Sequence, residues 1–176
     1  MERNSSAAPA TFCALAAFFT ITPLLAGSDK IAFPADYAKG VMYTSHDLMD
    51  AKEFREFYIT PPALDAVRKD QPLPSGTVII LARYNVQLDA QGKPVKDGHG
   101  RFIKTDLKAF RVMEKRTGWG SEYPPSKRNG EWEYQAFLAG GKVDERANLD
   151  NCFQCHKNGD SVNFMFTAVQ LKSAAK

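Results

Sequence analysis

The sequence contains little cysteine and little histidine, three of each in 176 residues. It also lacks any run of lysine or arginine, and its formal net charge of +3 is scattered along the chain. Because no basic stripe is present, nucleic acid is not an expected partner. With 44% hydrophobic and 24% charged residues, the chain is expected to build a packed core rather than stay disordered. One domain is the natural expectation at this length.

Residues 1–28 differ from the rest of the chain in composition. A short start that contains Arg3 is followed by a mostly small and apolar run, Ala7–Leu25, and charge returns at Asp29. This order is typical of a secretory signal peptide. An uncleaved membrane anchor is the alternative, because the run approaches the roughly 20 residues that span a bilayer. Prolines and threonines within the run favour cleavage. Both readings place a single folded domain, residues 29–176, outside the cytoplasm, and we expect it in the periplasm.

Cleavage would remove Cys13 and leave two cysteines, Cys152 and Cys155. Two cysteines in an exported protein ordinarily suggest one disulfide. Residues 152–156, however, read Cys-Phe-Gln-Cys-His, which is the C-x-x-C-H pattern of c-type heme attachment. The pattern predicts one heme c, bound covalently through both cysteines, with His156 as the proximal ligand of its iron.

The spacing of these residues explains why the pattern suits a heme. Cys152 lies three positions before Cys155 and four before His156, so a helix presents all three side chains on one face. Two thiols on that face can add to the two heme vinyl groups, and the imidazole then lies under the iron. Asp150 or Asn151 is expected to cap the start of this helix.

Two other kinds of site share part of the pattern. A zinc site needs a second pair of ligands, and the remaining histidines, His46 and His99, stand far apart in loop-like sequence. A thioredoxin-like redox pair opens a helix after a buried strand near the start of its domain, and it needs no trailing histidine. The sequence therefore favours heme over both alternatives.

The rest of the chain alternates in the manner of strands and shows no long helical periodicity. Strands are predicted over residues 54–59, 76–88, 107–113 and 132–138, with a turn at 89–94, a polar loop at 118–130 and a helix at 63–69. The last strand is expected to have one solvent-exposed face, and Pro61-Pro62 is expected to open the helix. Four-helix cytochromes also carry their attachment motif late in the chain, but their periodicity is helical throughout. The expected fold class is α+β and rich in β-structure, with a C-terminal heme-attachment helix.

Several short motifs occur in an order that resembles one known family. They are Tyr37–Met42, Arg55 with Tyr58, Gly76-Thr77-Val78, Gly130-Glu131-Trp132, Cys152–His156 and Phe164–Thr167. Together they resemble the cytochrome P-460 family, which includes the cytochrome c′-beta proteins, over roughly residues 36–172. The fold that this resemblance implies is a twisted antiparallel sheet with flanking helices, enclosing a mostly five-coordinate heme.

The resemblance also implies roles for three residues around the heme. Family members that oxidise hydroxylamine carry a lysine cross-linked to the heme edge, and Leu81 occupies that position here. The family's distal carboxylate falls within a residue or two of Phe110, where an apolar cap resembles the cytochrome c′-beta type, whose members bind nitric oxide. Arg55 matches the family's distal arginine, a fixed cation that could steady a bound anion or a propionate. The alternative roles are ordinary ones: Phe110 and Leu81 as core residues, and Arg55 as a solvated strand residue.

The sixth ligand position of the iron separates the possible functions. The side chains that could fill it are Met42, Met113, Met165, His46 and His99. Met42 and Met113 are most simply core residues and His99 a turn residue, while Met165 lies only nine residues past His156 and is not expected to reach the opposite face of the heme. We therefore expect an open sixth position. Lys104, Lys108 and Lys115 are expected to be solvated.

These observations predict an exported mono-heme c-type cytochrome that binds small nitrogen-oxide ligands such as nitric oxide. A hydroxylamine or nitric oxide oxidoreductase is the first alternative and needs a base near the iron. A simple periplasmic electron carrier is the second and needs a sixth protein ligand. A redox partner protein and a second copy of the chain are further expected partners, and a membrane is one only if the first segment is uncleaved. Resemblance of fold does not choose among these functions.

Overall fold

The computed structural model describes residues 30–159 and 163–176. Residues 1–28, for which a signal peptide is predicted, lie outside the described residues, as does Cys13. The elements are the 3-10 turn η1 (Tyr37–Lys39), the strands β1 (Val41–Leu48), β2 (Glu53–Ile59), β3 (Thr77–Val86), β4 (Lys104–Lys115) and β5 (Trp132–Leu138), and the helices α1 (Pro61–Arg68), α2 (Leu149–Lys157) and α3 (Ala168–Ala174). In the described part of the chain, no helix is long and apolar enough to cross a membrane.

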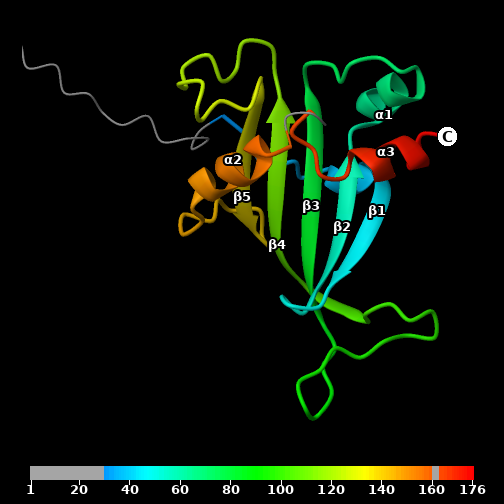
Figure 1. Ribbon diagram of the computed structural model, residues 1–176. Helices are drawn as coiled ribbons and strands as arrows, with labels where there is room; N and C mark the ends of the chain where they lie inside the picture. Colours follow the sequence, from blue (N-terminus) through cyan, green and yellow to red (C-terminus); the bar gives the residue numbers. More distant parts are fainter. Residues whose placement is uncertain (1–29, 160–162) are drawn as a thin grey trace, which may run out of the picture.

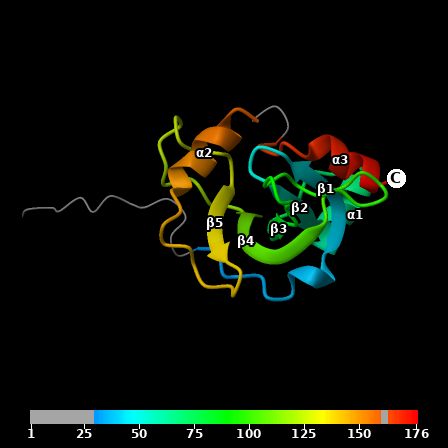
Figure 2. The ribbon, with the colours of Figure 1, turned by 90° about the horizontal axis from the view of Figure 1, so that it is seen from below.

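Five antiparallel strands form one sheet in the order β1-β2-β3-β4-β5, so every strand pairs with its neighbour in sequence. α2 lies across β4 and β5, and α3 lies across β1 and β2 (Figure 1). Seen along the sheet, α2 and α3 cover one face, and the segment around η1 crosses the opposite face (Figure 2). The architecture is therefore α+β with a five-stranded antiparallel sheet and three helices, which confirms the predicted α+β class and the antiparallel sheet that the resemblance implied.

The strands predicted at 54–59, 76–88, 107–113 and 132–138 correspond to β2, β3, β4 and β5. The predicted helix is α1, which begins with the two prolines, and residues 118–130 form an irregular loop. β1 is not among the strands predicted from the sequence. This strand is at the edge of the sheet and most of its residues are only half-buried, so its sequence lacks a clear apolar alternation.

One face of β5 was expected to lie in solvent, and this prediction is wrong. Glu133 and Gln135 are both buried. The Nζ atom of Lys30 lies 3.0 Å from Oε1 of Glu133, and the Tyr123 hydroxyl donates to Oε2 of the same carboxylate at 3.1 Å. The chain before η1 thus covers this face. A local pattern cannot show that cover, because part of it comes from Lys30, 103 positions before Glu133.

The sheet separates two hydrophobic cores. The core on the helix side contains Tyr43, Ile59, Leu64, Ile79, Met113, Tyr134, Phe153, Met165 and Leu171 among others. The core on the other side contains Ile31, Ile80, Ala82, Phe110, Val112 and Phe137, with Phe33 and Tyr37 packed against it. Successive residues of a strand point to opposite faces, so the helix-side residues of β3 and β4 alternate with those of the second core.

Candidate functional site

α2 carries the C-x-x-C-H sequence and begins where Asn148 caps it. The Asn148 side-chain oxygen accepts a hydrogen bond from the Asp150 backbone N–H at 3.0 Å. Capping by Asp150 or Asn151 was therefore a wrong prediction, since both residues lie inside the helix. The helix extends from Leu149 to Lys157, so Cys152, Cys155 and His156 share a face as their spacing requires.

These three side chains line one cavity of about 780 Å³ between the helices and the sheet. The other lining residues are Arg55, Phe57, Ile79, Leu81, Arg83, Arg111, Val112, Met113, Tyr134, Gln135, Asn151, Phe166 and Thr167. The volume is within the range of about 300–1,000 Å³ that is usual for cofactor and ligand sites. One part of the wall is apolar and aromatic, and another part carries three arginines.

The hydrogen bond of His156 determines which of its ring nitrogens is available. Nδ1 lies 2.6 Å from the carbonyl oxygen of Phe164, and because a carbonyl only accepts, Nδ1 carries the proton. Burial lowers the pKa of His156, although the hydrogen bond to Phe164 opposes this shift. The ring packs against Tyr134 and Phe166, with centroid distances of 4.8 and 5.2 Å. A neutral imidazole with Nδ1 protonated leaves Nε2 as the nitrogen that can bind a metal.

The two cysteines are free thiols rather than a disulfide. Cys152 is half-buried and Cys155 is exposed. Burial raises the pKa of the Cys152 thiol, and the nearby Arg111 guanidinium acts in the opposite direction. Within residues 30–159 and 163–176, no group of three His, Cys, Asp or Glu side chains could hold a metal ion. His46 instead packs edge-on against Phe57 at 5.5 Å.

Asn129 holds α2 against the sheet, and sequence analysis did not single it out. Its fully buried amide donates to the Tyr134 hydroxyl at 3.0 Å and to the Phe153 carbonyl at 2.9 Å. Phe153 lies between the cysteines on the buried side of α2, and its ring contacts Tyr123 and Tyr134 edge-on. No local pattern marks Asn129, because it belongs to the polar loop and its partners are distant in sequence or lie in the next strand.

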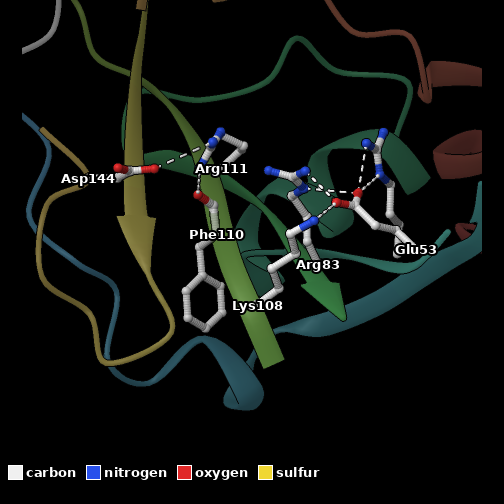
Figure 3. Close-up of polar contacts among 7 residues, drawn as sticks. Glu53, Arg83, Lys108, Phe110, Arg111 and Asp144 are labelled. Carbon is white, nitrogen blue, oxygen red and sulfur yellow. Dashed lines mark hydrogen bonds and ion pairs between the residues drawn. The ribbon is translucent and has the colours of Figure 1, made fainter. Parts of the chain in front are cut away.

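The structure places two of the three predicted pocket residues in the cavity. Arg55 and Leu81 line it, but Phe110 does not. Phe110 is 1% exposed and packs against Phe33 and Tyr37 on the opposite face of the sheet. Placing an apolar cap at Phe110 was therefore wrong. The next residue along β4, Arg111, points into the cavity instead, and Figure 3 shows the two side chains leaving the strand in opposite directions.

A buried carboxylate organises the cations at one end of the cavity. Glu53 is fully buried, and its Oε2 accepts from Nη2 of Arg55 at 3.0 Å and from Nε of Arg83 at 3.0 Å. Its Oε1 accepts from Arg83 and, at 2.9 Å, from Nζ of Lys108 (Figure 3). Burial alone would raise the pKa of Glu53, but hydrogen bonds from Arg83, Lys108 and Arg55 outweigh it and lower the pKa to about 2. Glu53 is therefore an ionised anchor for these cations.

Arg111 is held more loosely than the other two arginines. It donates to the carbonyl oxygen of Phe110 at 2.8 Å, and its Nη2 lies 3.7 Å from Oδ2 of Asp144. Burial lowers the pKa of the Arg111 guanidinium, and the nearby Arg83 lowers it further. Arg83 and Arg111 are not among the site residues predicted from the sequence. The alternation of β3 would have found the former, two residues after Leu81 on the same face.

The candidate sixth ligands are distributed over several places. Met113 lines the cavity, Met165 is in the helix-side core, and Met42 is half-exposed. His99 lies in an exposed turn of the hairpin between β3 and β4, where its backbone N–H donates to Asp97. Of the three lysines expected in solvent, Lys104 and Lys108 are exposed and also bind the carboxylates of Glu56 and Glu53, whereas Lys115 is half-buried and donates to the Leu73 carbonyl.

Comparison with known proteins identifies the family of the chain. The model of the family described as Cytochrome P460 matches residues 34–167, which is most of the chain and includes β1 to α2. No curated protein was found to match. The family implies a heme cofactor. The chain therefore belongs to the cytochrome P460 family, which makes it a heme cytochrome of the P460 type.

Proposed function

We propose that the chain is a mono-heme c-type cytochrome that binds small nitrogen-oxide ligands, such as nitric oxide, at an open iron position. Cys152 and Cys155 attach the heme and His156 is its proximal ligand. The observation that carries this proposal is the shared placement of the three side chains: they leave one face of α2 and line one wall of the same cavity.

The residues present fit a heme. The cavity is large, its wall offers aromatic and aliphatic side chains to a porphyrin, and His156 is neutral with Nε2 available. Each thioether would form by adding the sulfur and the proton of one thiol across one vinyl double bond, so attachment needs no oxidant. The bound heme supplies an iron centre that binds diatomic and nitrogen-oxide ligands, while the protein supplies the axial histidine, the polarity of the cavity and access to it.

Ligand binding fits the cavity better than hydroxylamine oxidation does. Among the residues that the structure describes, no aspartate or glutamate lines the cavity, so a carboxylate that could accept protons is missing there. Glu53 is near, but its two oxygens are bound by three cations. The aliphatic Leu81 lines the cavity at the position where the resemblance implies a cross-linked lysine.

A second candidate function is electron transfer, and one observation favours it. Met113 lines the cavity and is buried. A methionine thioether on the side of the heme opposite His156 would fill the sixth position and raise the reduction potential. The carrier alternative therefore requires Met113 as the ligand.

The proposal is tested by producing the full chain in a host that matures c-type cytochromes. We expect one heme per chain that resists extraction by acidified acetone, and a high-spin ferrous spectrum that changes on adding nitric oxide. A low-spin ferrous spectrum that does not change when nitric oxide is added would favour the electron-carrier function. Colourless protein with two free thiols would rule out the cytochrome proposal itself.

Export to the periplasm is part of the same proposal, supported by the composition of residues 1–28. Fractionation of the producing cells, followed by N-terminal sequencing of the purified cytochrome, tests it. Periplasmic protein that begins near Asp29 is the expected result. Protein that starts at Met1 and sediments with membranes would support an uncleaved anchor instead.

A further inference from the structure

The arginine end of the cavity has more positive than negative charge. Four cations gather there, Arg55, Arg83, Lys108 and Arg111, and the two carboxylates beside them are those of Glu53 and Asp144. Asp144 is also shared with Arg146, whose Nε lies 3.6 Å from Oδ1. The cluster therefore has an excess of at least two positive charges within the described part of the chain.

The positive charge that is least neutralised is that of Arg111, and the guanidinium of Arg83 lies near it. Arg83 donates through Nε and one Nη to Glu53, a carboxylate that it shares with two other cations. Arg111 has one hydrogen bond to a described residue, from Nη1 to a backbone carbonyl, and its nearest carboxylate oxygen lies beyond hydrogen-bond distance. Both guanidinium groups rise from the sheet on the same side, next to each other (Figure 3). Two neighbouring like charges in a half-buried site are unfavourable unless an anion lies between them.

We propose that Arg83 and Arg111 together bind a small planar oxyanion, of the carboxylate or nitrite class, inside the cavity that His156 lines. The inference rests on the proposed function for its link to a heme, and it adds to that cavity a place for a negatively charged group. Guanidinium groups offer parallel N–H donors that match the two oxygens of such an anion, which is why arginine pairs are suited to carboxylates and similar groups. The anion could come from outside, as nitrite, or be a propionate of the heme.

Isothermal titration calorimetry with nitrite tests the site. The wild-type holoprotein should bind nitrite, and Arg111→Gln should raise the dissociation constant about tenfold or more, because charge-assisted hydrogen bonds are lost. Arg111→Lys retains the charge without the forked donor and should show an intermediate loss. Arg68→Gln is the matched control, since Arg68 pairs with Asp65 on the exposed side of α1, outside the cavity. Its nitrite affinity should equal that of the wild type.

Two further measurements identify the source of the anion. Nitric oxide is uncharged, so its affinity should change less than about threefold in Arg111→Gln if the arginines act through charge. If a propionate occupies the site, any nitrite binds at the iron instead, and its affinity will be the same in wild type and Arg111→Gln. The propionate bending bands in the resonance Raman spectrum will then shift in Arg111→Gln but not in Arg68→Gln. Weaker nitrite binding in Arg111→Gln assigns the oxyanion to external nitrite, and a shift of the propionate bands assigns it to the heme. Either result supports an oxyanion at the two arginines.

The proposal is overturned if Arg111→Gln leaves both the nitrite affinity and the propionate bands unchanged. If the heme does not attach, the propionate measurement falls away, but calorimetry still tests the arginines, because it detects nitrite binding in colourless protein as well. In that protein, equal nitrite binding by wild type and Arg111→Gln, or no binding by either, overturns the proposal. Failure of heme attachment and failure of the arginine site are therefore separate observations.

Discussion

The Nδ1 atom of His156 lies 2.6 Å from the carbonyl oxygen of Phe164, eight residues later in the chain. Phe164 and the residue before it, Asn163, both have positive φ angles, 59° and 55°, which residues with a side chain rarely adopt. The side-chain oxygen of Asn163 also accepts a long hydrogen bond of 3.4 Å from the Trp132 indole. The turn after α2 therefore orients the imidazole through its backbone, and the ring orientation of His156 depends on it.

His156→Ala should keep its covalent heme and lose its native spectrum. The thioethers need only the two cysteines, whereas the iron loses its axial nitrogen, and free imidazole added to the protein should restore part of the ferrous spectrum. Optical spectra with a heme count per chain check this. His99→Ala, in the exposed turn of the hairpin, is the control and should have the wild-type spectrum. An unchanged spectrum in His156→Ala would refute the ligand assignment.

Asn129→Ala should destabilise the protein by about 1–3 kcal/mol, because it removes two buried hydrogen bonds that the side-chain amide donates. Urea denaturation of the holoprotein measures the loss. Asn85→Ala is the matched control: this asparagine is exposed on β3, and its removal should change the free energy of unfolding by no more than about 0.5 kcal/mol. Equal stability of the two variants would show that Asn129 does not hold α2.

Stability should fall in acid because of Glu53. Its pKa is about 2 in the folded protein, and an ordinary glutamate has a value of 4.5. The carboxylate therefore contributes its full stabilisation above pH 4.5 and loses it as the pH falls towards 2. The contribution is on the order of 1–3 kcal/mol, allowing for screening of the partly exposed cations.

Glu53→Gln makes this prediction measurable. The gap in unfolding free energy between wild type and Glu53→Gln should narrow steadily as urea denaturation is repeated from pH 6 to pH 3. Asp65→Asn, on the exposed side of α1, is the comparison. Its unfolding free energy should differ from that of the wild type by no more than about 0.5 kcal/mol at every pH from 6 to 3. A gap for Glu53→Gln that is constant with pH would contradict the assignment of this carboxylate as an ionised anchor.

Met113→Leu separates an open iron position from a methionine-bound one. Leucine nearly conserves the side-chain volume, so the cost in stability should be below about 1.5 kcal/mol. With an open sixth position, the ferrous spectrum and the affinity for nitric oxide should be those of the wild type. Met49→Leu, at an exposed site, is the control. Conversion of a low-spin wild-type spectrum into a high-spin one in Met113→Leu would instead identify an electron carrier.

Much of the fold could be predicted from local sequence. β3 is rich in β-branched residues, α1 begins with two prolines, and the predicted strands β2 to β5 all form. The C-x-x-C-H spacing likewise predicted one helical face, and α2 presents Cys152, Cys155 and His156 to one cavity. Whether these residues attach a heme stays a prediction, although membership of the cytochrome P460 family implies that cofactor.

The character of the pocket was decided by tertiary structure. In a strand, a shift of one residue moves a side chain to the other face, so an alignment uncertain by one position could not choose between Phe110 and Arg111. With Phe110 facing the cavity, this part of its wall would be apolar, whereas Arg111 makes it cationic. Glu53 could not be identified as an anchor either, because its three cations come from three different strands. Motifs carried by one turn of a helix can be read locally, whereas charge, burial and polarity around a site depend on neighbours that only the folded chain brings together.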